Sequence, residues 1–189
     1  MEFEEDILRC LEILHKGGII LYPTDTIWGI GCDATNSEAV NKIVVLKQRP
    51  TVKSMIVLLA DARQINRYTS HAEPFISEYL EKTDRPTTVI YEGALGIAEN
   101  LISEDGSIAI RIVKEDFCRH LIKRFRKPIV STSANRSGDE PPKDFNGIST
   151  AILQGVDYTV KYRQQDRTAG HASILIRFNK NREPIVLRP

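Results

Sequence analysis

The most unusual chemical feature of the sequence is a pair of cations at the end of an apolar helical run, Lys47 and Arg49 in "LKQRP". Lys47 comes seven residues after Val40 and three after Val44, so it falls on the inward face of the predicted helix. A lysine on that face needs an anion, and no acidic residue lies one turn away in the sequence. A phosphate or carboxylate ligand is the natural partner, with Lys53 as a third cation nearby. The alternative, that these cations only complement the helix dipole, stays open, above all for Arg49.

Hydroxyl and amide side chains are concentrated in a second stretch, "STSANRSGDEPP" at residues 131–142. Alternation along an extended chain places Ser131, Ser133 and Asn135 on one side. Small hydroxyl groups together with backbone N–H groups can hold phosphate or carboxylate oxygens without adding charge. The same residue types also form turns after strands, and this interpretation stays open too.

The stretch "YPTDTIWGIGCDA", residues 22–34, contains the spacing G-x-G-x-x-A of a dinucleotide-binding turn. The predicted strand ends at Pro23, too early for the tight strand–turn–helix unit. No acidic residue stands where one would hold a ribose, since that position is Arg49-Pro50. We therefore reject a dinucleotide site, and keep Thr24 and Thr26 as candidates for hydrogen bonding a small polar ligand.

Arg111 interrupts the apolar strand pattern of "GSIAIRIV". It is either a solvated residue on a polar sheet face or a ligand-binding residue. The histidines show no metal-ligand spacing, and the sequence contains neither a nucleophile elbow nor a P-loop. We expect surface or capping roles for them (His15, His71, His120 and His171).

Composition indicates an ordinary globular protein of 189 residues, with 41% hydrophobic and 27% charged residues. A net charge of +1 limits any nucleic-acid contact to a local patch. Three widely separated cysteines predict no disulfide framework and suit a cytoplasmic setting. The acidic N-terminus is no signal peptide, and no run approaches the length of a membrane span, so we expect no membrane partner.

Hydrophobic periodicity predicts an α/β domain with a mixed, twisted sheet. One helix is expected to end at Gly17-Gly18, and another to run from a capping box at Thr35 and Glu38 to Pro50. A third covers residues 114–125, and the expected strands lie at 19–24, 54–61, 87–93, 107–113, 128–135, 172–178 and 183–189.

Taken together, these stretches resemble the short, single-domain form of the YrdC/TsaC-type threonylcarbamoyl-AMP synthases, over nearly the whole chain. The matching segments are "GGIILYPTDTIWGIGCDA", "LKQRP" for the family's K-x-R-P, "SIAIR", "STSANRSGDEPP" for its S-x-N and proline-containing loop, and the closing "VLRP".

The resemblance implies a single domain over residues 1–189, with an open, twisted sheet of parallel and antiparallel strands and flanking helices. It implies L-threonine, bicarbonate and ATP as substrates, with Mg²⁺ brought in by ATP and no protein metal cage. The product would be threonylcarbamoyl-AMP, which a separate transferase complex uses to modify an adenosine beside the tRNA anticodon. By position, Lys47 and Arg49 would be catalytic. L-threonine would be held by Thr26, Arg111, Ser131 and Ser173, and the ATP side would be lined by Arg49, Lys53, Ser107, Ser133, Asn135 and Arg188.

Several positions depart from the family pattern, mostly on the amino-acid side. The stretch before the third expected strand reads "TDRPTTV", and "KSM" replaces K-P-L after the cations. Leu58 stands where some members carry a histidine that contacts threonine, and of the usual P-S-T or E-S-T strand only Ser173 survives in "HASIL".

Two alternatives to the enzyme are therefore kept. One is a module of the same fold that binds double-stranded RNA through Lys47, Arg49, Lys53, Arg111 and Arg188, although near-neutral charge and 7% aromatics argue against it. The other is a nucleotide-binding paralogue with a different carbamoyl or acyl substrate.

Overall fold

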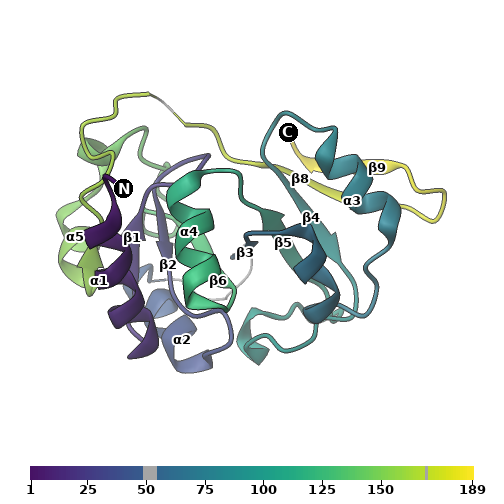
Figure 1. Ribbon diagram of the computed structural model, residues 1–189, viewed down its shortest axis with the longest axis horizontal. Coiled ribbons are helices and arrows are strands. Elements are labelled where there is room, and N and C mark those ends of the chain that lie inside the picture. The colour runs from purple at the N-terminus through teal and green to yellow at the C-terminus, as the bar shows by residue number, and fades with distance from the viewer. Residues whose placement is uncertain (49–54, 169) are drawn as a thin grey trace.

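A computed structural model of the chain describes residues 1–48, 55–168 and 170–189. Within them, nine strands form one sheet in the order β7-β1-β2-β6-β3-β5-β4-β8-β9 (Figure 1). The strands are β1 (Ile20–Tyr22), β2 (Gly29–Gly31), β3 (Ile56–Leu59), β4 (Thr87–Tyr91), β5 (Ile108–Ile112), β6 (Ile129–Ser133), β7 (Tyr158–Thr159), β8 (Ile174–Phe178) and β9 (Pro184–Arg188).

The sheet mixes both pairing modes. β1 pairs parallel with β7, β3 with β5, and β4 with β8. The remaining neighbours are antiparallel, among them β2 with β6 and β4 with β5. The predicted α/β fold with a mixed sheet is therefore confirmed.

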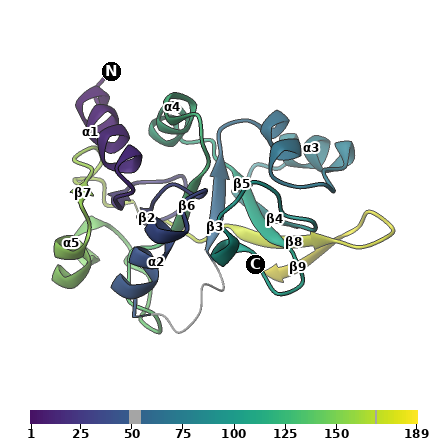
Figure 2. The same ribbon diagram turned by 90° about the horizontal axis from the view of Figure 1, so that it is seen from below.

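Helices cover both faces of the sheet. Figure 2 shows α1, α4 and α3 above the strands, and α2 and α5 below them. The bounds are α1 (Glu4–His15), α2 (Ser37–Leu46), α3 (Pro74–Glu81), α4 (Asp116–Phe125) and α5 (Thr150–Gly155), with short 3₁₀ helices at Ala62–Arg67, Glu99–Leu101 and Phe145–Gly147. Among the described residues no helix has the length and apolar character to cross a membrane.

The helix α2 differs at both ends from the prediction. Its N-cap is Asn36, whose side chain accepts hydrogen bonds from the backbone N–H groups of Glu38 and Ala39 at 3.0 and 3.1 Å. Thr35 is not the cap, because its own N–H and hydroxyl both donate to Asp33. The helix ends at Leu46, well before Pro50, since Gln48 has a φ of 51°, which a right-handed helix cannot continue through.

The strand β2 was not predicted, because two of its three residues are glycine, which has low strand propensity. The structure gives a reason for Gly31: a Cβ there would lie 2.4 Å from the carbonyl oxygen of Val130 on the next strand. Gly31 therefore serves sheet packing, in agreement with the rejection of a dinucleotide turn. The elements α3, α5 and β7 were also missed.

One buried carboxylate joins the N-terminal helix to a distant part of the chain. Asp6 is 4% exposed. Its oxygens accept hydrogen bonds from the Tyr158 hydroxyl at 2.6 Å and from the N–H groups of Lys161 and Tyr162 at 3.0 and 2.9 Å. The segment after β7 is thus fixed against α1.

We expect Asp6→Ala to lower the free energy of unfolding by about 2 kcal/mol, because three donors lose the buried carboxylate that accepts their hydrogen bonds. Glu5→Ala is the matched control: its ion pair with Lys161 spans 3.4 Å between exposed side chains, so little change is expected. Urea unfolding followed by circular dichroism measures both. Equal effects of the two substitutions would contradict the role given to Asp6.

Candidate functional site

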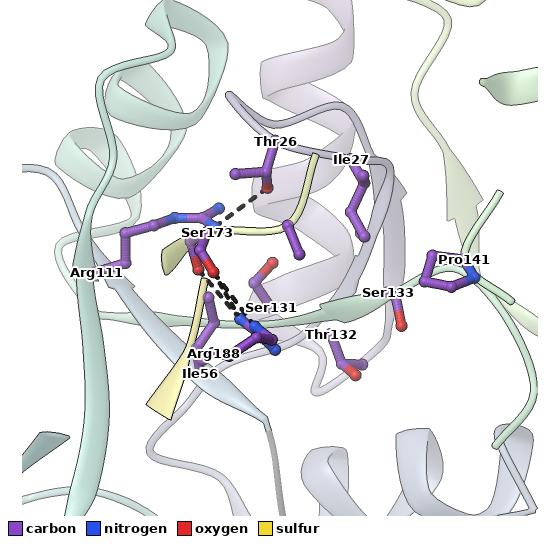
Figure 3. A pocket seen from close by; sticks show the side chains of 12 residues that line it. Thr26, Ile27, Ile56, Arg111, Ser131, Thr132, Ser133, Pro141, Ser173 and Arg188 are labelled. Atoms are coloured by element: carbon purple, nitrogen blue, oxygen red, sulfur yellow. Dashed lines mark hydrogen bonds between the residues drawn. The ribbon is translucent and has the colours of Figure 1, made fainter. Parts of the chain in front are cut away.

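A cavity of about 260 Å³ is lined by residues of β2, β3, β5, β6 and β9 and of the neighbouring loops. One part of its lining is apolar, from Ile27, Ile56 and Pro141. The polar lining consists of hydroxyl and guanidinium groups, from Thr26, Arg111, Ser131, Thr132, Ser133, Ser173 and Arg188. In Figure 3 the side chains of Thr26, Arg111, Ser131, Ser173 and Arg188 are drawn close to one another. The structure thus brings together all four residues expected to hold L-threonine.

Arg111 is the central cation of this cavity. It lies in β5 and is 2% exposed, so the interpretation as a solvated surface arginine is wrong. Its Nη1 donates to Thr26 Oγ1 at 3.1 Å, and its Nη2 lies 3.1 Å from Asp25 Oδ1. This ion pair lacks hydrogen-bond geometry, so Nε and Nη2 have no hydrogen-bond acceptor among the described residues. A buried guanidinium with two such donors is suited to an anionic ligand.

A second cation stands at the mouth of the cavity. Arg188 of β9 donates through Nε and Nη2 to the carbonyl oxygen of Ser173, at 3.3 and 3.0 Å (Figure 3). Burial of its guanidinium and then the charge of Arg111 lower the pKa of Arg188. The guanidinium of Arg188 nevertheless stays charged at neutral pH, since arginine does not lose its proton in proteins. An anion between Arg188 and Arg111 would relieve their repulsion.

Lys47 faces inward, as its spacing predicted, and is 1% exposed. Its Nζ donates to the backbone carbonyl oxygens of Ser133 and, at 2.5 Å, Asn135. In return the N–H of Ser137 donates to the carbonyl oxygen of Lys47 at 2.9 Å. Lys47 therefore holds the end of β6 in place and does not line the cavity described above. A direct contact with a ligand stays a prediction.

The other residues expected on the ATP side have varied positions. Ser133 and Arg188 line the cavity, whereas Ser107 does not and donates its hydroxyl to Asp105 Oδ1 at 2.6 Å. Asn135 donates to the carbonyl oxygens of Arg136 and Asp139, which shapes the loop after β6. The predictions for Arg49 and Lys53 lie outside the described residues.

Sequence reasoning missed the apolar wall and two glycines that allow close packing beside the cavity. A Cβ at Gly29 would lie 3.0 Å from Ser131 Oγ, and one at Gly170 would lie 1.5 Å from the carbonyl oxygen of Thr26. Gly29 was a possible signal, since it stands among the polar candidates of residues 22–34. Nothing in the local pattern distinguishes Gly170.

The described residues contain no group of three or more histidine, cysteine or acidic side chains that could hold a metal ion. Among the described residues, the polar lining of the cavity consists of hydroxyl and guanidinium groups, without a carboxylate. None of the four histidines lines the cavity, and three of them are exposed (His15, His71 and His171).

We expect Lys47→Met to lower the free energy of unfolding by about 2 kcal/mol, because two carbonyl groups lose a charged donor while the apolar stem is kept. Lys42→Met, in the preceding helix α2, removes an exposed hydrogen bond to the carbonyl oxygen of Gly17 and should change the free energy of unfolding little. Chemical unfolding compares the two. A gain of stability in Lys47→Met would mean that its buried charge is poorly compensated, against this assignment.

Known proteins share this architecture. The crystal structure of P. abyssi Sua5 complexed with L-threonine superposes with a TM-score of 0.86 at 20% sequence identity, over 98% of this chain and 54% of that one. E. coli YciO gives 0.78 at 22% identity, over 97% and 88% of the two chains. T. kodakarensis HypF gives 0.80 at 20% identity, over 96% and 24%.

At these identities the similarity is one of fold, and the chain spans about half the length of P. abyssi Sua5. A family model named for Sua5, YciO and YrdC, with the description "Telomere recombination", matches residues 12–189. The resemblance inferred from the motifs is therefore confirmed: the chain belongs to the Sua5/YciO/YrdC family.

Proposed function

We propose that this chain is an L-threonylcarbamoyladenylate synthase, a nucleotidyltransferase that forms threonylcarbamoyl-AMP and pyrophosphate from L-threonine, bicarbonate and ATP. The observation that carries the proposal is the buried guanidinium of Arg111, in a cavity lined by hydroxyl groups. Its Nε and Nη2 have no hydrogen-bond acceptor in the part of the chain that the structure describes. This arrangement suits a small carboxylate ligand with further polar groups. The L-threonine complex of P. abyssi Sua5, a protein of the same fold, supports the choice of amino acid.

The reaction needs a nucleophilic amine and stabilised phosphate charge. The amino nitrogen of L-threonine forms a bond to the carbon of bicarbonate, and water leaves, giving a carbamate. A carbamate oxygen then bonds to the α-phosphorus of ATP, and the bond to the departing pyrophosphate breaks. Negative charge grows on the phosphate oxygens in this second step, so fixed cations and hydrogen-bond donors contribute more than an ionising base.

The cavity residues divide between these tasks. Arg111 would hold the amino acid by its carboxylate, which positions the amine. Arg188, and Ser133, which Figure 3 draws away from Arg111, would donate to phosphate oxygens. Lys47 would keep Ser133 in place by donating a hydrogen bond to the backbone carbonyl oxygen of Ser133.

Mg²⁺ would enter with ATP, whose phosphate oxygens supply the hard ligands that this ion prefers. This fits a polar lining of hydroxyl and guanidinium groups. The bound ion would neutralise charge on the leaving pyrophosphate. The adenylate product would pass to a transferase complex that modifies tRNA, and the protein would act in the cytoplasm.

A paralogue that uses another amine or acyl substrate is the second candidate. The observation that favours it is Leu58, which is fully buried and contributes no polar group to the cavity. The substrate side of the cavity therefore lacks any contact from that position.

We expect pyrophosphate release from ATP only when both L-threonine and bicarbonate are present. An enzyme-coupled pyrophosphate assay with each substrate omitted in turn measures this requirement, and L-serine tests specificity. Pyrophosphate release with another amino acid, but not with L-threonine, would favour the second candidate. A folded sample without amino-acid-dependent release would rule out the proposal, and RNA affinity that falls steeply with salt would then favour the RNA-binding alternative.

We expect Arg111→Lys to raise the KM for L-threonine about tenfold or more, because an ammonium group cannot reproduce the planar fork that binds a carboxylate. The KM for ATP should change less. Arg177→Lys is the control, since Arg177 is exposed on β8 and outside the cavity. An unchanged KM for L-threonine in Arg111→Lys would remove Arg111 from the amino-acid site.

A further inference from the structure

Two threonine hydroxyl groups lie next to each other beside Arg111, in the loop after β1. Thr24 Oγ1 and Thr26 Oγ1 are 2.8 Å apart. Thr24 is 4% exposed, whereas Thr26 lines the cavity. The direction of the hydrogen bond between them decides what Thr26 can offer to a ligand.

That direction follows from the hydrogen bonds of Thr24. A threonine hydroxyl has one hydrogen to donate and two lone pairs that accept. Thr24 Oγ1 donates to the carbonyl oxygen of Ile27 at 2.8 Å, because a carbonyl can only accept. It also accepts from the N–H of Thr26 at 3.0 Å. Its remaining capacity is one lone pair, so Thr26 is the donor in the bond between the two hydroxyls.

Thr26 has therefore used its only hydrogen. Its Oγ1 also accepts from Arg111 Nη1 at 3.1 Å, as Figure 3 shows. One lone pair of Thr26 Oγ1 is left, on a residue that lines the cavity. Toward a ligand this hydroxyl can accept a hydrogen bond but cannot donate one.

We propose that Thr24 is a positioning residue that fixes Thr26 as a hydrogen-bond acceptor for the amino group of the bound amino acid. The inference rests on the proposed function and deepens it. Arg111 supplies donors for the carboxylate of the same ligand. The site thus offers donors to the carboxylate and an acceptor to the amino group. Thr26 cannot hold the carboxylate, which itself only accepts.

This polarity also matters for the reaction. The lone pair of the amine must attack the carbon of bicarbonate. A hydroxyl that donates a hydrogen bond to that lone pair would make the amine less nucleophilic. An acceptor-only hydroxyl binds an N–H of the amine and leaves the lone pair free. Because Thr24 is buried, bulk water has little access to its hydroxyl and cannot readily take the place of Thr24 as the hydrogen-bond partner of Thr26.

The test is a binding cycle without ATP, by isothermal titration calorimetry. L-threonine and L-serine are compared with their counterparts without the amino group, (R)-3-hydroxybutanoate and 3-hydroxypropanoate. Wild-type protein should prefer each amino acid by about tenfold or more, since a hydrogen bond to a charged group is lost. In Thr26→Val this preference should disappear, because the amino acids bind more weakly while the affinity for the analogues without the amino group is unchanged.

If Thr26 instead donates to the carboxylate, Thr26→Val weakens both members of each pair equally, which overturns the inference. Wild-type protein that does not prefer the amino acids overturns it as well. Loss of pyrophosphate release with the binding preference intact would count against the proposed function alone.

Thr24 is tested by two substitutions. Thr24→Val removes the hydroxyl at similar volume and frees the hydrogen of Thr26, so the preference for the amino acids should fall several-fold. Thr24→Ser keeps the hydroxyl, so its preference for the amino acids should be higher than that of Thr24→Val. A full preference in folded Thr24→Val overturns the role of Thr24; should this variant fail to fold, the Thr26 cycle still decides the polarity of the hydroxyl.

Discussion

The buried guanidinium of Arg111 imposes the strongest constraint on this structure. A positive charge inside a sheet is costly unless oppositely charged and accepting groups surround it. Arg111 lies between Leu58 and Thr88 on the neighbouring strands, neither of which is charged. Its compensation comes from the loop after β1, through Asp25 and Thr26. Asp25 is in turn fixed by the N–H of Lys114, two residues after β5.

This requirement explains why the cavity is built from segments that are distant in the sequence. The loop after β1 must return over β5 to reach the charge, and β6 and the segment before β8 complete the walls around the gap that remains. Lys47 anchors the end of β6 from below, and Gly170 lets the segment before β8 pass against the backbone of Thr26. The unsatisfied donors of Arg111 are a consequence: within the described ranges, its partners compensate the charge without accepting from every N–H.

Part of this arrangement could be predicted from the sequence. Helical periodicity correctly turned Lys47 inward, because facing depends only on spacing along one element. It could not identify the carbonyl groups of Ser133 and Asn135 as partners, which are set by tertiary packing. Strand alternation left Arg111 undecided, since both faces of the sheet are covered by other parts of the chain. The short strand β2 was missed because its glycines are required by a neighbouring strand, and no local pattern reports such a neighbour.

The position of Arg188 has a practical consequence for work with this protein. This residue lines the cavity and directly precedes Pro189. A purification tag joined after Pro189 would therefore emerge beside the cavity opening and bring its own charges there. The N-terminus lies at the opposite end of the sheet, beside α1 and β1 (Figure 1). Tags, fluorophores and surface attachments are better placed at that end.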